Sequence, residues 1–123
     1  MAMKFNPVPT VATGGCIRFT NDGPQVHHNE THTSSGIRAV RIDDQGRIEI
    51  LHTSPGPIIT MSANADETLV SRGIAFGCSG GVGRTLLIPA ANGKKLDLSR
   101  DDHYELLSGT YANVWVHWLH DVS

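Results

Sequence analysis

The stretch GIRAVRIDDQGRIEIL, residues 36 to 51, gives the clearest indication of how this chain folds. Residues 37 to 42 are rich in β-branched side chains, and residues 47 to 50 alternate charged side chains with isoleucine. An alternation of period two is typical of a strand with one buried face. Between the two runs, residues 43 to 46 form a turn signal in which Gly46 is suited to a positive φ. The stretch therefore predicts an antiparallel β-hairpin.

Short strand candidates, separated by turn residues, continue on both sides of this hairpin. They are expected at residues 16–20, 58–61, 73–77, 84–88, 94–98 and 111–120. Residues 62 to 73 predict either a short helix or a polar loop, and SRDD at 99 to 102 has the form of a capping box, which predicts one helical turn. Roughly seven to nine short strands without a long helix predict an all-β fold, either a β-sandwich or a jelly-roll-like barrel.

The chain is predicted to have two parts. Residues 1 to 15 are expected to form an extended N-terminal arm, because Pro7 and Pro9 block a helix and a pair of glycines ends the segment. Residues 16 to 123 are expected to form a single β-sandwich domain. Within it, residues 21 to 36 are polar and turn-rich, which predicts a long loop.

Composition and charge narrow the function classes. The 123 residues are 39% hydrophobic and 18% charged, which fits one folded domain with a modest core. A net charge of -2 gives no overall basic field, so nucleic acid is not expected as a partner. The sequence has no apolar run of transmembrane length and no signal-peptide core, so no membrane is expected. The two cysteines, Cys16 and Cys78, are expected to be thiols in a cytoplasm.

The segment CSGGVGRT, residues 78 to 85, has the spacing C-x5-R-T and resembles the signature loop of cysteine-dependent protein tyrosine phosphatases. The resemblance implies that Cys78 is the nucleophile, Arg84 the phosphate clamp and Thr85 the hydroxyl that assists the leaving thiol. That chemistry needs a helix after the loop to lower the thiol pKa, and Pro89 follows too soon for one. We favour a glycine-rich loop between two antiparallel strands, and we predict no catalytic residue.

The segment HHNETH, residues 27 to 32, offers side chains that ligate zinc, nickel or iron. These are His27, His28, Glu30 and His32, with His117 or His120 as remote candidates. The set resembles that of the cupins, a jelly-roll family, although the H-x-H of that family is missing. An extended strand would spread the ligands too far apart, so a metal site needs a curled loop. We favour a solvated polar loop and expect no metal and no cofactor.

The segment YANVWVHWLH, residues 111 to 120, is apolar on both of its predicted faces. One face would carry Val114, Val116 and Trp118, and the other Trp115, His117 and Leu119. A strand that is apolar on both faces is either central in a sheet or packed against another subunit.

In length, composition and layout, most visibly IRAVRIDDQGRIEIL and ANVWVHWL, the chain is similar to small virion proteins of tailed bacteriophages. These are capsid decoration proteins and head-spike base proteins. The similarity implies a structural, non-enzymatic protein that is assembled in the host cytoplasm and located in the virion. It also implies a homo-oligomer, a trimer or a pentamer, that binds the major capsid protein or another virion protein. The expected interface residues are Phe5, Pro7, Val8, Pro9, Trp115, His117 and Trp118.

Two alternatives from other classes stay open. The first is a small enzyme, either the phosphatase or the cupin-like metal protein described above. The second is a carbohydrate-binding module, which would need exposed aromatic side chains on a flat face. The sequence has only two Trp, two Tyr and three Phe residues, which argues against the second alternative.

Overall fold

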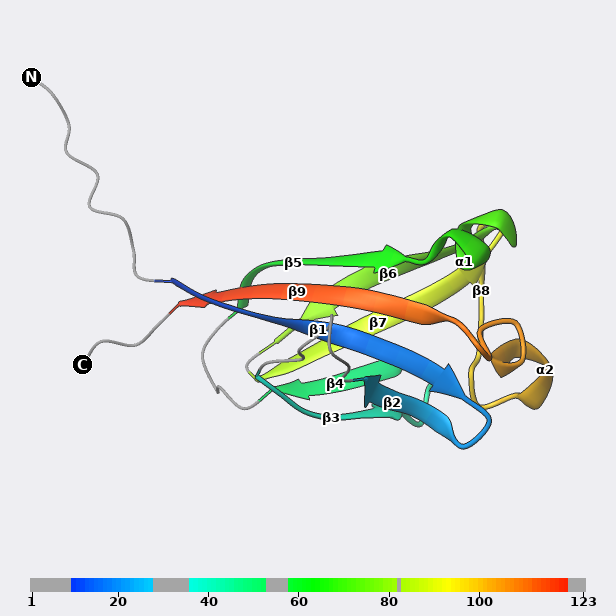
Figure 1. Cartoon of the computed structure of the whole chain (residues 1–123), viewed down its shortest axis with the longest axis horizontal. Coiled ribbons are helices and arrows are strands. Elements are labelled where there is room, and N and C mark those ends of the chain that lie inside the picture. Colours follow the sequence, from blue (N-terminus) through cyan, green and yellow to red (C-terminus); the bar gives the residue numbers. More distant parts are fainter. Residues whose placement is uncertain (1–9, 28–35, 53–57, 82, 120–123) are drawn as a thin grey trace, which may run out of the picture.

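The computed structural model describes residues 10 to 27, 36 to 52, 58 to 81 and 83 to 119. It confirms the all-β prediction, because two antiparallel sheets pack face to face as a β-sandwich (Figure 1). The jelly-roll alternative stays a prediction. We call the sheet that contains β1 (Thr10–Thr20) and β9 (Tyr111–Leu119) sheet A, and the sheet that contains the hairpin of residues 36 to 51 sheet B.

Sheet A has four strands in the order β2-β1-β9-β5, and each strand is antiparallel to its neighbours. They are β1 (Thr10–Thr20), β2 (Gly23–His27), β5 (Ile58–Ala65) and β9 (Tyr111–Leu119). The tryptophan-containing strand β9 lies between β1 and β5, which confirms the prediction of a central strand. Its expected role as an interface stays a prediction.

Sheet B has the order β3-β4-β7-β6, with a short strand β8 paired to β7. The strands are β3 (Ile37–Ile42), β4 (Ile48–His52), β6 (Ile74–Gly80), β7 (Arg84–Ala91) and β8 (Lys94–Lys95). Strands β3 and β4 form the predicted hairpin, and Arg41 lies opposite Glu49 in its register. The edges of the two sheets adjoin, since β2 lies beside β3 and β5 lies beside β6.

The expected arm, residues 1 to 15, falls into two parts. Residues 1 to 9 lie outside the described residues, whereas Thr10 to Gly15 belong to β1 and pair with β9. Thr10 lies opposite Leu119, so the first and last described residues are side by side at one end of the sandwich.

The prediction that residues 21 to 36 are all loop is wrong for Gly23–His27, which form β2. Asn21 and Asp22 make a tight turn, and Gly23 takes a φ of 108°, which favours glycine. The chain therefore reverses at once and pairs with β1. Strand β2 is an edge strand, which explains why its sequence is polar and lacks a clear hydrophobic alternation.

Two short helices connect strands at one end of the sandwich, α1 (Glu67–Ser71) and α2 (Asp101–Tyr104). The carboxylate of Asp66 caps α1, because it accepts hydrogen bonds from the backbone N–H groups of Thr68 and Leu69. The capping box expected before α2 does not form, since Ser99 donates its hydroxyl to Asp97 instead. In the part of the chain that the structure describes, neither helix has the length and hydropathy of a membrane-spanning segment.

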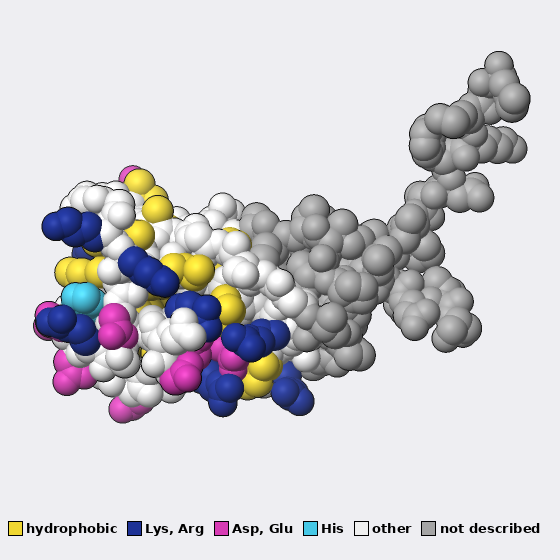
Figure 2. All heavy atoms as spheres, turned by 180° about the vertical axis from the view of Figure 1, so that it is seen from behind, with side chains coloured by type: hydrophobic (Ala, Val, Ile, Leu, Met, Phe, Trp, Pro, Cys, Tyr) yellow, Lys and Arg dark blue, Asp and Glu magenta, His cyan; other side chains and the backbone are white. Residues whose placement is uncertain are grey.

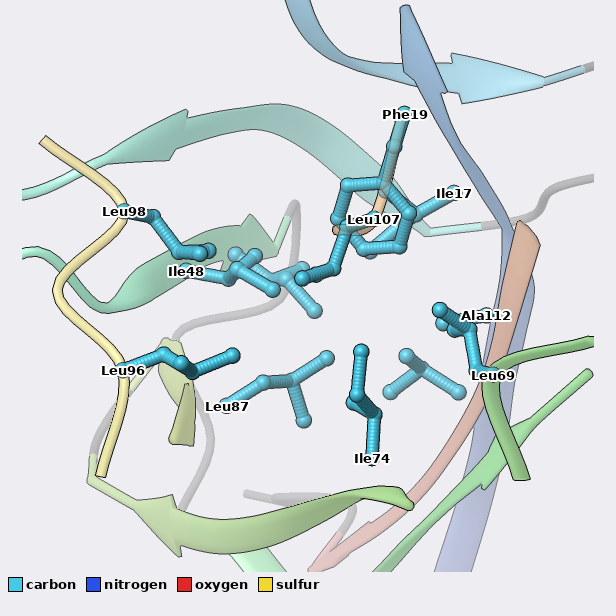
Figure 3. Packing of buried hydrophobic residues seen from close by; sticks show 12 residues of the cluster. Ile17, Phe19, Ile48, Leu69, Ile74, Leu87, Leu96, Leu98, Leu107 and Ala112 are labelled. Atoms are coloured by element: carbon cyan, nitrogen blue, oxygen red, sulfur yellow. The ribbon is translucent and has the colours of Figure 1, made fainter. Parts of the chain in front are cut away.

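The core lies between the two sheets and is closed at the helical end by the segments that follow β8. Figure 3 shows side chains from sheet A, from sheet B and from these connections pointing into the same interior. Phe19 is fully buried there, stacked on Phe76 and edge-on to Tyr104. The buried cluster comprises Ile17, Phe19, Ile48, Ile50, Leu69, Ile74, Leu87, Leu96, Leu98, Leu107, Ala112 and Val114.

The turn of the β3–β4 hairpin depends on the glycine that the sequence places there. Gly46 is buried, has a φ of 76°, and accepts a hydrogen bond from the backbone N–H of Leu98 on its carbonyl. A Cβ at this position would lie 2.9 Å from the Cα of Asp97, which is closer than real Cβ atoms approach. The turn and the Leu96–Leu98 segment therefore hold one another in place.

We expect Gly46→Ala to lower the free energy of unfolding by about 2 kcal/mol. Two costs add: the strain of a positive φ in a residue other than glycine, and the clash of the new Cβ with the backbone of Asp97. Gly93→Ala is the matched control, since Gly93 has a φ of 82° and a Cβ there would meet no heavy atom within 4 Å. The control should lose only about 1 kcal/mol in urea unfolding. Equal losses for the two variants would show that the contact with Asp97 contributes nothing.

Candidate functional site

The outer face of sheet B, the face turned away from the core, carries the most unusual side chain in the described residues. Along β4 the side chains alternate, so Ile48 and Ile50 face the core and Glu49 faces outward. Glu49 is nevertheless only 4% exposed. A carboxylate is seldom buried to this extent without a positively charged partner.

Two arginines from neighbouring strands bind this carboxylate. Arg41 of β3 lies directly opposite Glu49 and donates its Nε–H to Oε1. Arg84 of β7 reaches the other oxygen, with 3.0 Å between its Nε and Oε2. Because Glu49 uses both of its oxygens, one buried carboxylate holds two guanidinium groups on the outer face of the sheet. We call these three residues the arginine clamp.

The arginine clamp carries one net positive charge, and its positive groups are the accessible ones. The side chains of Arg41 and Arg84 are 66% and 45% exposed, against 5% for Glu49. Each arginine contacts Glu49 through Nε, and among the described residues its two terminal nitrogens have no acceptor. These terminal nitrogens are therefore the groups that a ligand or a partner protein would meet.

Two shallow hollows lie on either side of Arg84. The larger, of about 390 Å³, is lined by the whole clamp together with Ile42, Asp43 and Asp44. The smaller, of about 290 Å³, is lined by Ser79, Gly80, Gly81, Arg84 and Leu86, and none of these is acidic. The two hollows therefore differ in charge although they share Arg84.

In the larger hollow, Asp43 is already paired. Its carboxylate accepts hydrogen bonds from the backbone and the guanidinium of Arg47, each 2.8 Å long, and another from the backbone of Gln45. Burial alone would raise the pKa of Asp43, but the hydrogen bonds and the charge of Arg47 lower it on balance. Asp44 is exposed, so this hollow is less favourable for an anion than the smaller one.

Figure 2 views the molecule from behind Figure 1, the side on which sheet B lies. Lys and Arg side chains lie across this face together with Asp and Glu side chains, and hydrophobic side chains lie between them. One of the hydrophobic residues on the outer face is Leu86, which lies opposite Glu49 and is only 9% exposed. The outer face of sheet B thus combines hydrophobic side chains with charges of both signs, and the arginine clamp is its most exposed positive group among those described above.

The sequence that resembles a phosphatase loop forms the predicted antiparallel hairpin, with β6 paired to β7. No helix follows Arg84, because Arg84 begins β7. Cys78 pairs with Leu87, a core residue, whereas Arg84 lies on the outer face with Leu86. The sulfur of Cys78 and the guanidinium of Arg84 therefore belong to opposite faces of sheet B. Cys78 is exposed, but desolvation still raises the pKa of its thiol, which is the opposite of what a thiolate nucleophile requires.

The metal-ligand candidates are mostly outside the described residues. His27 ends β2, and its ring lies edge-on to Tyr111 with centroids 5.2 Å apart. Of the other candidates, His117 lies in β9, whereas His28, Glu30, His32 and His120 lie outside the described residues. Within the described ranges, no group of three or more metal-ligating side chains comes together.

The expected interface residues are placed only in part. Residues 5 to 9 lie outside the described residues. The backbone of Trp115, His117 and Trp118 lies in β9, where each residue pairs with β1 on one side and β5 on the other. The structure therefore gives their position in sheet A but does not test them as an interface.

The remaining buried ionisable side chains are structural. His52 is 5% exposed, and its Nε2 lies 2.7 Å from the hydroxyl of the fully buried Thr85. Burial lowers the pKa of His52 to about 4, so the imidazole is neutral near pH 7. Burial, with a smaller contribution from Asp66, raises the pKa of the Cys16 thiol. No disulfide joins Cys16 to Cys78.

Comparison with known proteins gives no matching family model, no matching curated protein and no matching solved structure. The site is therefore interpreted from its own geometry.

Glu49 and Arg41 were not predicted as site residues, although the sequence holds a signal for them. The turn of the hairpin fixes a register that places Arg41 opposite Glu49, and opposite charges are favourable as a directly facing pair. Arg84 was singled out only within the phosphatase resemblance. Its pairing with Glu49 depends on β4 lying beside β7, and no local sequence signal gives that contact between distant segments.

Proposed function

We propose that this protein is a structural assembly protein, a virion component of the capsid-decoration or head-spike-base type. It binds the major capsid protein or another virion protein and self-associates as a trimer or a pentamer. The observation that carries the proposal is the outer face of sheet B, where apolar side chains lie beside two arginines that a buried carboxylate holds in place. The more specific part of the proposal, that the assembly is a virion, comes from the resemblance of the chain's layout to phage virion proteins.

The composition of this face favours a protein partner. Protein interfaces are enriched in arginine, the buried core of an interface is more apolar than its rim, and the energetic centres are well packed. Arg41 and Arg84 are fixed through Nε by Glu49, so they lose less conformational freedom on binding than unanchored arginines would. A partly apolar surface on which a buried carboxylate anchors two exposed arginines is suited to docking against another folded protein.

The proposal also gives a role to the N-terminal arm, which is attached to the sandwich at a different place from the outer face of sheet B. Because Thr10 and Leu119 are neighbours, residues 1 to 9 join the sandwich where β9 ends. An arm contact would therefore originate at the end of the sandwich where Thr10 pairs with Leu119. The expected arm contacts are Phe5, Pro7, Val8 and Pro9.

The proposal is tested on virus particles from the source of this sequence. Particles banded in a density gradient should contain the chain in many copies, as measured by quantitative mass spectrometry. A variant that lacks residues 1 to 9 keeps all of β1, so it should fold but no longer enter the particles. Replacement of the same residues by a Gly/Ser segment of equal length is the control for length, and it should also be excluded. Absence of the full chain from banded particles would overturn the proposal.

A further inference from the structure

We infer that the smaller hollow beside Arg84 binds a single carboxylate, the side chain of an acidic residue on the partner protein. This inference rests on the proposed function, because it names the chemistry by which the outer face of sheet B recognises its partner. The geometry that points to it is a guanidinium whose terminal nitrogens have no acceptor among the described residues. It stands above a hollow none of whose described lining residues is acidic.

Arg84 is prepared for such a ligand. Its Nε lies 3.0 Å from Oε2 of Glu49, and this ion pair keeps the guanidinium beside the hollow while leaving the terminal N–H groups for a second acceptor. A carboxylate matches a pair of guanidinium N–H groups in a two-point hydrogen bond. Because Glu49 is itself only 4% exposed, the ionic partner of Arg84 is a buried group although the Arg84 side chain is 45% exposed.

The lining of the smaller hollow completes the site. Ser79 lies opposite Leu86 in the pairing of β6 with β7, so both are next to one another on the outer face. The hydroxyl of Ser79 can donate a hydrogen bond to a carboxylate oxygen. Leu86 offers apolar contact to the methylene groups of an Asp or Glu side chain. Gly80 and Gly81 have no side chain and leave the backbone accessible.

The charges favour a carboxylate on a protein over a polyanion. The arginine clamp has one net positive charge, which a single carboxylate neutralises. The larger hollow on the other side of Arg84 presents Asp43 and Asp44, and the whole chain has a net charge of -2. A nucleic acid brings closely spaced phosphates and needs several cations along its path. An acidic side chain brings one charge and fits beside Arg84 without approaching the two aspartates.

The test is a titration of the full chain, labelled with ¹⁵N, with the peptide acetyl-Ala-Glu-Leu-amide. Signals of the Arg84 Nε–H and of the Ser79, Gly80 and Gly81 amides should shift and saturate. The peptide acetyl-Ala-Gln-Leu-amide, which has the same shape without the charge, should leave them unchanged. Arg84→Gln should weaken binding about tenfold, the loss expected for a charge-assisted hydrogen bond.

The controls distinguish peptide binding in the smaller hollow from a general attraction to the positive charges of this face. Arg41→Gln removes one positive charge from the same clamp. Because Arg41 lines only the larger hollow, this substitution should weaken binding by less than about threefold. Arg84→Gln combined with Glu49→Gln leaves no buried unpaired carboxylate and keeps the test valid if the single variant is unstable. Equal losses for Arg41→Gln and Arg84→Gln would overturn the inference, as would tighter binding of inorganic phosphate than of the glutamate peptide.

The result is independent of the particle experiment. Saturable binding of the glutamate peptide by a chain that is absent from virus particles would support the carboxylate site and contradict the proposed function. A Glu49→Gln and Arg84→Gln double variant that enters particles as efficiently as the natural chain would contradict the carboxylate site and support the proposed function.

Discussion

Phe19→Ala is expected to lower the free energy of unfolding by about 3 to 5 kcal/mol, the largest loss expected of the substitutions proposed for this protein. Phe19 is fully buried and contacts Phe76 and Tyr104 at centroid distances of 6.3 and 6.4 Å. Its backbone is fixed as well, since its N–H and carbonyl bond to Thr110 and Gly109. The backbone of Phe19 therefore keeps its place when the ring is removed, and a cavity remains between its neighbours.

Urea unfolding followed by circular dichroism measures this loss directly. Phe19→Leu should lose much less, about 1 kcal/mol, because it keeps most of the buried volume. Val70→Ala provides the surface control, since Val70 is 61% exposed on α1 and should change stability by less than about 0.5 kcal/mol. If Phe19→Ala cost no more than Val70→Ala, Phe19 would not be the contact between the sheets and the helical end that the structure describes.

Acid should destabilise the fold through His52 between pH 6.5 and about 4. The pKa of His52 is lowered from 6.5 to about 4 by burial, so the unfolded chain takes up a proton in this range and the folded chain does not. The free energy of unfolding therefore falls as the pH drops through this window, by about 3 kcal/mol in total. Above pH 6.5 the neutral imidazole contributes no pH dependence.

The measurement is a series of urea midpoints from pH 7 to pH 4. His52→Gln should remove most of the fall, because glutamine can keep a hydrogen bond to Thr85 and does not titrate. His103→Gln is the control, since it removes a histidine of α2 and leaves His52 in place, so the fall should persist. The lowered pKa of Asp43 affects stability only below its usual value of 3.8, outside this window. A variant lacking His52 that still lost the full amount would contradict this assignment.

Local patterns predicted most of the fold. The hairpin around Gly46, the strands on either side of CSGGVG and the terminal strand with its tryptophans all follow from alternation and turn chemistry. The segment Gly23–His27 was missed because edge strands tolerate polar sequences. It forms a strand because it pairs with β1, and its own residues carry no strand pattern. The order of strands within each sheet depends on contacts between distant segments, which no local pattern contains.

The candidate site was less predictable than the fold. The hairpin register would have placed Arg41 against Glu49, but the depth at which Glu49 is buried depends on Arg84 and on the packing of β7 beside β4. The resemblance to a phosphatase loop drew attention to Arg84 for a different reason. The strand register places Arg84 on the outer face and Cys78 on the opposite one, so the residues of one short motif separate into two environments.

The most direct test of the proposed self-association is native mass spectrometry of the purified, untagged full chain. It reports the number of subunits and any bound metal in the same spectrum. The proposed function predicts a metal-free trimer or pentamer that persists when the protein is diluted. A monomer, with or without a stoichiometric zinc, nickel or iron ion, would contradict it.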